Sequence, residues 1–223
     1  MPESRNSIQY VDTADDVVRV VQLTDTHLCK TRGGTLLGMD TDHSLQAVID
    51  LVKTERANAH LVLGTGDLAD GGARPAYDRL QVYFDQLTPD NYWLPGNHDS
   101  REAMAAASRP NRLCREIRIS RWQLLLLDSQ VPGQVGGTLG EDELVWLERA
   151  LQSAHEDALY TLVCLHHQPV AVGCSWLDEQ MVSDAEGFFA VLDRYPGVRA
   201  VLWGHVHQEI DRQSNGVRLL ASP

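Results

Sequence analysis

Short apolar runs alternate along this chain with segments of helical periodicity. The runs are typical of buried strands and lie at 17–23, 60–66, 92–96, 122–128, 159–165 and 198–204. Between them, helices are expected at 41–52, where Thr41 or Asp42 is the expected N-cap, and at 76–87, 101–108, 141–154 and 184–194. The final segment predicts a hairpin that turns at Asn215-Gly216. Strands interleaved with helices indicate an α/β domain with sheet at its centre.

The length of the chain suits one domain. Its 223 residues are enough for one substantial core, and the sequence shows no repeats, low-complexity tracts or interdomain linkers. We therefore expect residues 1–223 to form a single domain. The chain stops at Pro223, just beyond an apolar run that predicts a strand, so we also expect that C-terminal strands are missing from it.

Charge and cysteine usage exclude several classes of protein. The formal net charge is −12, and no block of Lys and Arg offers a nucleic-acid-binding surface. Cys29, Cys114, Cys164 and Cys174 lack the pair spacing of a metal site and are expected to be reduced thiols. The sequence has neither the apolar stretch of a signal peptide nor a run long enough to span a bilayer. We therefore predict no membrane association and a cytoplasmic location.

Side chains that commonly bind metals directly follow five of the predicted strands. In chain order they are Asp25, His27, Asp67, Asn97, His98, His166, His167, His205 and His207. Singly, each motif is more typical of a turn, a cap or a structural histidine. In an open α/β sheet, however, strand ends gather at one edge, where ligands bind. Repetition at five equivalent positions indicates a metal centre, because so many polar groups buried together without a partner would be costly.

The residue types narrow the choice of metal. No cysteine belongs to the set, which excludes a structural zinc site of the thiolate kind. Imidazole, carboxylate and amide groups together suit Fe, Mn, Zn or Co. Seven ligands are too many for one ion, namely Asp25, His27, Asp67, Asn97, His166, His205 and His207. Two divalent ions about 3.5–4 Å apart that share one carboxylate would use them all, and such pairs are usual in phosphoester hydrolysis.

Five ordered motifs resemble those of the calcineurin-like metallophosphoesterases. They are "DTH" at 25–27, "GDLAD" at 66–70, "GNHD" at 96–99, a histidine before "QP" at 166, and "GHVH" at 204–207. The resemblance implies a four-layer α/β/β/α sandwich with a dimetal site at the C-terminal edge of the strands. It assigns the first metal to Asp25, His27, Asp67 and His207, and the second to Asp67, Asn97, His166 and His205. Asp67 would then bridge the metals, and His167 would have a supporting role.

Stretches between these motifs resemble a narrower group, the bacterial class III 3′,5′-cyclic AMP phosphodiesterases. Examples are "TLLGMD", "LLLLDSQVPG", "LVWLERAL" and "NGVRLLASP". This likeness implies a metal-dependent phosphodiesterase that hydrolyses cyclic AMP to 5′-AMP with a hydroxide bridging the two metals, thereby lowering cellular cyclic AMP. Fe and Mn are the expected metals, with Zn, Co or Mg as alternatives.

Further residues have expected roles around this centre. His98 is expected to stabilise the transition state and protonate the leaving oxygen, or else to give hydrogen-bonding support. Asp70 resembles the family's acid that orients this histidine, with an exposed turn residue as the alternative. Asp99 is expected to cap the helix that follows it. Cys174 and Trp176 are candidates to line the nucleotide pocket, although Trp176 equally fits ordinary loop packing. Substrate contacts are expected from His27, Asp67, Asn97, His98, His166 and His207.

Two alternatives to a cyclic AMP phosphodiesterase stay open. One is another phosphodiesterase with the same centre, acting on glycerophosphodiesters, 2′,3′-cyclic nucleotides or nucleotide-sugar diphosphates. The other is a non-catalytic scaffold that keeps the fold without metals, and the complete ligand set with His98 argues against it. The expected partner is a cyclic nucleotide, and a homodimer is left open.

Overall fold

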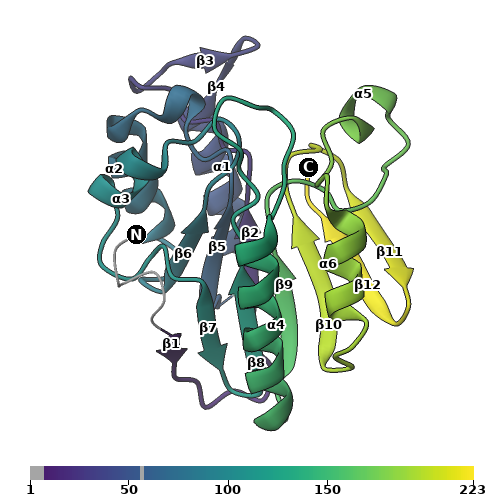
Figure 1. Cartoon of the computed structure of the whole chain (residues 1–223). Helices are drawn as coiled ribbons and strands as arrows, with labels where there is room; N and C mark the ends of the chain where they lie inside the picture. The colour runs from purple at the N-terminus through teal and green to yellow at the C-terminus, as the bar shows by residue number, and fades with distance from the viewer. Residues whose placement is uncertain (1–7, 56–57) are drawn as a thin grey trace.

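Two β-sheets pack face to face at the centre of the protein, whose computed structural model describes residues 8–55 and 58–223 (Figure 1). The larger sheet has the strand order β1 (Ile8–Val11), β7 (Glu116–Ile119), β8 (Trp122–Leu126), β9 (Tyr160–Cys164), β10 (Val198–Trp203), β12 (Val217–Ala221) and β11 (Ile210–Ser214). The smaller sheet consists of parallel strands β2 (Val20–Leu23), β5 (Leu61–Thr65) and β6 (Asn91–Leu94). Strands β3 (Thr35–Leu36) and β4 (Met39–Asp40) form a separate hairpin.

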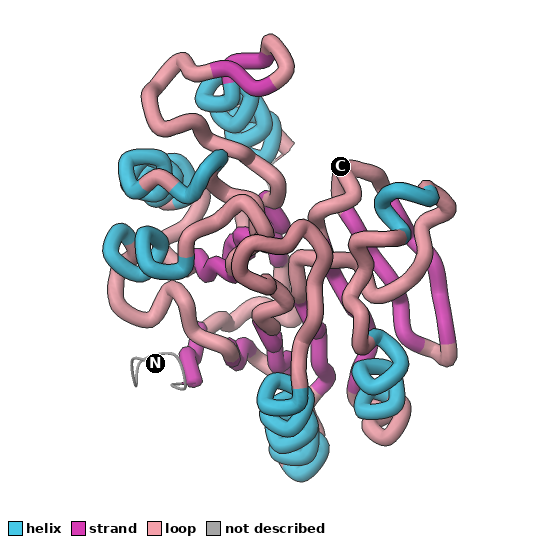
Figure 2. Tube along the Cα trace, turned by 45° about the horizontal axis from the view of Figure 1, so that its top comes forward, coloured by secondary structure: helices cyan, strands magenta, loops and turns pink. Residues whose placement is uncertain are grey.

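Helices cover the outer face of each sheet (Figures 1 and 2). The smaller sheet is covered by α1 (Thr41–Thr54), α2 (Arg74–Phe84) and α3 (Arg101–Ala107), and the larger sheet by α4 (Glu141–Glu156) and α6 (Ala185–Leu192). A single turn, α5 (Ser175–Asp178), lies in the loop after β9. Helix α4 shows why these segments are helical, since three acidic residues in its first turn favour the helix dipole and Leu147 and Leu151 are buried one turn apart.

Alternation along the strands produces three separate cores. In β5, Leu61 and Leu63 face the other sheet, whereas Val62 between them packs under the helices. On the larger sheet, Leu124 faces the smaller sheet and Leu125 faces α4 and α6. The layers are therefore helix, sheet, sheet and helix, and the four-layer α/β/β/α prediction is confirmed. The sheet that the sequence predicted at the centre of the domain consists of two separate sheets.

Three differences from the predicted elements have a local cause. The strand predicted at 17–23 is shorter, since β2 begins at Val20. Strands β1 and β7 were not predicted, because each is four residues long and polar residues alternate with its apolar ones, so neither forms an apolar run. The β3–β4 hairpin was also not predicted, because its turn is Leu37-Gly38 rather than one of the residue pairs that signal a hairpin.

Helix α1 is capped by a different residue from those predicted. Asp40, rather than Thr41 or Asp42, accepts a hydrogen bond from the backbone N–H of His43. Asp42 is buried and pairs instead with Arg79, at 2.9 Å. The predicted C-terminal hairpin, by contrast, is confirmed as β11–β12, with both residues of its Asn215-Gly216 turn at positive φ. None of the described helices is both long enough and apolar enough to cross a membrane.

Candidate metal centre

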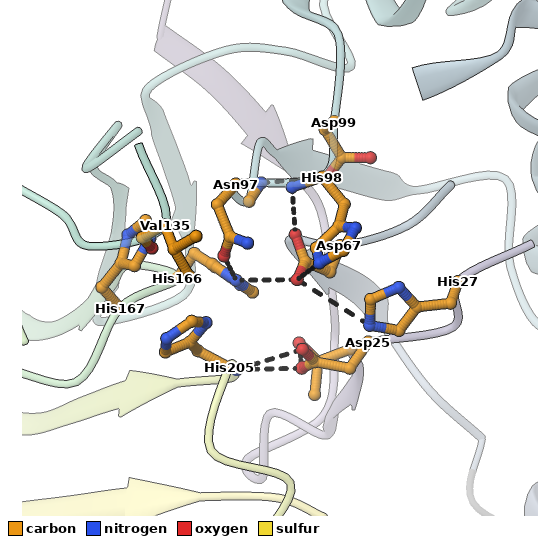
Figure 3. Close-up of polar contacts among 12 residues, drawn as sticks. Asp25, His27, Asp67, Asn97, His98, Asp99, Val135, His166, His167 and His205 are labelled. Carbon is orange, nitrogen blue, oxygen red and sulfur yellow. Dashed lines mark hydrogen bonds and ion pairs between the residues drawn. The ribbon is translucent and has the colours of Figure 1, made fainter. Parts of the chain in front are cut away.

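The predicted metal-binding residues meet where strands of both sheets end (Figure 3). β2, β5 and β6 of the smaller sheet lead to Asp25 and His27, to Asp67, and to Asn97 and His98, respectively. β9 and β10 of the larger sheet lead to His166 and to His205 and His207. Groups of three among these histidines and aspartates have potential ligand atoms within 4.8 Å of one another. The structure thus brings together segments that are far apart in sequence, such as Asp25 and His205, which are 180 residues apart.

Five of the seven predicted ligands have left-handed backbone conformations. They are Asp25, His27, Asp67, His205 and His207, with φ between 41° and 65°. Such conformations are uncommon for residues other than glycine, and they cluster at functional sites where the surrounding structure enforces them. Here the enforcement is visible, because Asp25 N–H donates to the Gly66 carbonyl at 3.0 Å and His27 N–H to the Asp67 carbonyl at 2.9 Å.

One side of the centre is organised around Asp25. Its carboxylate accepts hydrogen bonds from the hydroxyl of Thr24, at 2.6 Å, and from the backbone N–H of His205, at 3.0 Å. The Nε2 atom of His207 lies 3.2 Å from Asp25 Oδ1. Glycine at position 204 permits this approach, because a Cβ there would lie 2.2 Å from Thr24 Oγ1. The last strand-end motif, "GHVH", is therefore connected to the first, "DTH", through the carboxylate of Asp25.

The other side is organised around Asp67. Its Oδ1 accepts a hydrogen bond from the backbone N–H of His98 at 2.8 Å, and its Oδ2 lies 3.3 Å from His166 Nε2 and 3.8 Å from His27 Nε2. His166 Nε2 is also 3.2 Å from the side-chain oxygen of Asn97. One oxygen of Asp67 thus faces ligands predicted for both metals, as a bridging carboxylate must.

The electrostatics of the centre favour a cation. Burial raises the pKa of both carboxylates, but their hydrogen bonds and neighbouring histidines lower the pKa of Asp25 and Asp67 below the ordinary value overall. Burial opposes protonation of His166, yet Asp67 raises its pKa to about 9. Burial lowers the pKa of His205 to about 4, whereas a hydrogen bond to Asp25 raises that of His207. Two buried carboxylates therefore stay charged, and a bound metal would supply the positive charge that His166 otherwise provides.

His27 and His167 show which imidazoles are free to bind a metal. Burial lowers the pKa of His27, and its Nδ1 is buried without a hydrogen-bond partner in the described part of the chain. Both ring nitrogens of His167 are engaged, Nδ1 with the Ser129 hydroxyl at 2.8 Å and Nε2 with the Val135 carbonyl at 2.9 Å. The structure therefore fits His27 as a ligand better than His167, and the supporting role of His167 stays a prediction.

Asp99 does not cap the following helix as predicted. Ser100 is the N-cap of α3, and its hydroxyl accepts from Ala103 N–H at 3.2 Å. Asp99 is buried and accepts hydrogen bonds from the backbone N–H groups of Leu68, Ala69 and Gly96 and from the Tyr77 hydroxyl. Burial, together with the Asp67 charge, raises its pKa to about 6. Asp99 therefore joins the "GDLAD" and "GNHD" loops, and this role could not be predicted because most of its partners are backbone N–H groups.

Two glutamines near the centre were also absent from the sequence-based predictions. The amide of Gln130 donates to the carbonyls of Gly96 and Asp99, at 2.7 and 2.6 Å. The Oε1 atom of Gln180 lies 3.0 Å from His205 Nε2. Gln130 lies in the stretch "LLLLDSQVPG", but neither glutamine belongs to a metal-binding motif, so only the folded structure reveals that the loops after β8 and α5 support the ligands.

His98 and Asp70 lie at the solvent-facing side of the centre. His98 Nδ1 is 3.6 Å from Asp70 Oδ1, and both side chains are nearly half exposed. The rings of His98 and His27 are in edge contact, with centroids 4.8 Å apart. His98 is thus held beside the ligands while its imidazole can still reach a bound molecule.

A cavity of about 390 Å³ adjoins the centre on the side of Asp25, His27 and His207. Neither Cys174 nor Trp176 is among its lining residues, although both were candidates to line the nucleotide pocket. Trp176 lies on α5 with 61% of its surface exposed, and Cys174 packs against the core of the larger sheet. Another cavity of about 500 Å³ lies between α3 and β6, and none of the predicted ligands lines it.

Comparisons with known proteins agree on one family. The family model described as calcineurin-like phosphoesterase matches residues 18–209. The chain is 43% identical over 210 residues to the 3′,5′-cyclic adenosine monophosphate phosphodiesterase CpdA of Pseudomonas aeruginosa, covering 94% of this chain and 76% of that protein. It is 42% identical over 209 residues to the protein of the same name from Escherichia coli K12, covering 92% and 75%. A crystal structure of a dimetal phosphatase from Danio rerio has a similar fold, with a TM-score of 0.72 at 17% identity over 93% of this chain and 87% of that one.

Proposed function

The chain belongs to the calcineurin-like phosphoesterase family, and we propose that it is a metal-dependent phosphodiesterase that hydrolyses 3′,5′-cyclic AMP to 5′-AMP. The observation that carries this proposal is the identity of more than 40% to two proteins named as cyclic AMP phosphodiesterases, over more than nine-tenths of this chain. The likeness extends well beyond the metal-binding motifs, which supports a shared substrate as well as a shared fold. Such activity would lower cellular cyclic AMP.

We propose that two divalent ions bind at the centre. Asp25, His27, Asp67 and His207 would hold the first, and Asp67, Asn97, His166 and His205 the second, so that Asp67 bridges. The fit rests on the donor set, on the unpartnered buried nitrogen of His27 and on the two charged carboxylates. Fe and Mn suit this mixture of donors best, with Zn, Co or Mg as alternatives. When bound, such ions lower the pKa of a coordinated water and offset the charge of a phosphate group.

His98 would act on the substrate directly. Its backbone is fixed by the hydrogen bond from its N–H to Asp67, while its half-exposed ring faces the space in front of the ligands (Figure 3). An imidazole in this position can hydrogen-bond to the phosphate and give a proton to the leaving 3′ oxygen. Asp70 Oδ1 lies 3.6 Å from His98 Nδ1, so Asp70 would orient the ring. His27, Asp67, Asn97, His166 and His207 would contact the phosphate.

We also propose a cell compartment and a small-molecule partner. All four cysteines are free thiols in the structure, which supports the cytoplasm as the compartment. A cyclic nucleotide is the proposed small-molecule partner. A homodimer stays a prediction.

A substrate panel tests the proposal. Metal-replete protein is assayed with 3′,5′-cyclic AMP, 3′,5′-cyclic GMP, 2′,3′-cyclic AMP, a glycerophosphodiester and a nucleotide-sugar diphosphate. We expect 5′-AMP from cyclic AMP, with kcat/KM at least about tenfold above that for the last three. Rapid turnover of another diester without cyclic AMP hydrolysis would overturn the substrate assignment. Less than one metal per chain together with no phosphatase activity after Mn²⁺ addition would favour the non-catalytic scaffold.

A further inference from the structure

We propose that the cavity beside Asp25, His27 and His207 binds the purine base of the nucleotide, between the β3–β4 hairpin and helix α1. This inference rests on the proposed function, because it assigns the base of that substrate to a place next to the proposed metal centre. This cavity is an alternative base site to the loop around Cys174 and Trp176, which does not line it.

The position of the cavity suits a ligand whose phosphate lies at the metal centre. Its lining includes three of the proposed metal ligands and continues outward from them over the hairpin and the helix. Its volume of about 390 Å³ lies within the range of roughly 300–1,000 Å³ that is usual for small-molecule sites. A nucleotide bound with its phosphate near His27 can therefore extend its base into this space without any rearrangement of the fold.

The chemistry of the walls suits a neutral aromatic ring rather than a charged group. The hairpin and α1 contribute the apolar lining residues Leu36, Leu37, Met39, Leu45 and Val48, and Pro223 adds another apolar side chain to the wall. Among the described residues that line the cavity, none is Lys or Arg, so nothing there would attract a second anionic group. The charges of the site lie at the metal end. The phosphate would thus bind at the metal end of the cavity, and the base at its apolar end.

Leu37 at the tip of the hairpin is the clearest sign that this wall has a function. It adopts a φ of 50°, a conformation that a two-residue turn usually gives to Asn, Asp or Gly, and its side chain is fully exposed. Met39 and Val48 nearby are also exposed, at 58% and 42%. A leucine that strains the turn and buries nothing does not stabilise the folded chain. An apolar surface of this kind, directly beside a reactive centre, is expected where a ligand covers it.

The test compares two variants of the cavity with a matched control. Leu37→Asn removes the apolar side chain while giving the turn a residue that suits its backbone, so folding should not suffer. Val48→Gln removes an apolar contact from α1. Leu51→Gln is the control, because Leu51 lies on the same helix with 57% of its surface exposed but does not line the cavity. Metal content and urea unfolding are measured for each protein.

The readout is KM against kcat for two substrates. For cyclic AMP we expect the double variant Leu37→Asn, Val48→Gln to raise KM about tenfold or more at unchanged kcat, because uniform binding of the base is lost. For the 3′,5′-cyclic phosphate of an abasic ribose, KM should be the same in the wild type, the double variant and the control. An unchanged KM for cyclic AMP, or equal changes for both substrates, would overturn the inference.

Photolabelling separates this inference from the proposed function. The wild type is irradiated with 8-azido-cyclic AMP, and labelled peptides are mapped. Label within residues 35–48 supports the base site, and it does so even if cyclic AMP is not turned over, in which case only the proposed function fails. Label within residues 174–178, or label at neither segment, overturns the base site. Cyclic AMP turnover by the same preparation would then leave the proposed function intact.

Discussion

The two sides of the candidate metal centre are held in different ways. On the buried side, Asp67, Asp99, His166 and His167 are almost wholly inaccessible, and nearly every polar atom has a fixed partner. On the open side, Asp70, His98 and His207 are about half exposed and make few contacts, and the adjacent hairpin carries the exposed Leu37.

This difference separates two tasks. A side chain with several buried partners cannot move without breaking them, so the buried side can set the distances between metal ligands. A half-exposed imidazole such as His98 keeps one face free for a substrate. We therefore expect changes on the buried side to alter metal content and stability, and changes on the open side to alter rate or KM while the metals remain.

The largest effect is expected for Asp67→Ala. This substitution removes the carboxylate that faces the ligands of both proposed metals, and it leaves His166 without its nearest negative charge. Both ions should be lost, and phosphodiesterase activity should fall by more than about 10³-fold. Elemental analysis per chain and turnover at saturating cyclic AMP measure the two effects.

Asp78→Ala provides the matched control, because Asp78 is an exposed helix carboxylate that lies 3.9 Å from its ion-pair partner Arg74. It should keep both metals and full activity. If Asp67→Ala retained two metals per chain, the bridging role would be wrong, and the buried side would not be what holds the ions.

The open side is tested by His98→Ala. Metal content should stay at two ions per chain, because the backbone N–H of residue 98, which binds Asp67, remains. Loss of a general acid of this kind usually lowers kcat by about 10²–10⁴-fold. Loss of metal from this variant would place His98 with the ligands instead.

Asp70→Asn should lower kcat by about tenfold or less, because its contact with His98 is long and screened by solvent.

The sequence predicted the proposed metal ligands but not the residues that support them. Each ligand lies directly after an apolar strand, and strand-end position is a local property that the sequence displays, so all seven predicted ligands were found in one place. The four layers followed from the resemblance to a family. Asp99 and Gln130 were misjudged or missed, because their partners are backbone groups of loops distant in sequence.

The left-handed backbone conformations at the centre could also not be predicted from the sequence. The motifs "DTH" and "GHVH" give no sign that four of their residues adopt left-handed conformations, since aspartate and histidine tolerate several backbone states. Likewise, the turn at Leu37 could not be predicted, because a leucine there opposes the local preference of the chain.

A further prediction concerns Asp99, which supports the buried side without being a proposed ligand. In Asp99→Asn, one carboxylate oxygen becomes an NH₂ group that faces backbone N–H donors, so at least one buried donor loses its partner. The free energy of unfolding should fall by about 2 kcal/mol. Urea denaturation of the metal-free protein measures this, and Tyr77→Phe, which removes one hydrogen bond to Asp99, should cost about 1 kcal/mol. Wild-type stability in Asp99→Asn would show that the loops are joined by other contacts.

The last prediction is a pH dependence that arises from His167. Burial lowers the pKa of His167 to about 3 in the folded chain, whereas the ordinary value is 6.5. Below pH 6.5 the unfolded chain therefore binds a proton that the folded chain does not, and the free energy of unfolding falls by about 1.4 kcal/mol per pH unit for this group. Above pH 6.5 His167 is neutral in both states and contributes no slope.

His167→Gln removes this proton while leaving an amide that can still bond to Ser129 or to the Val135 carbonyl. Urea unfolding of the metal-free proteins between about pH 5 and pH 8 should therefore show parallel curves above pH 6.5 and a shallower decline for the variant below it. The wild type and the variant must be compared because other buried histidines also titrate. His205, with a pKa of about 4, contributes a slope of the same sign in both proteins. Equal slopes in the two proteins would mean that His167 can be protonated without unfolding, and that the buried side is less rigid than its hydrogen bonds imply.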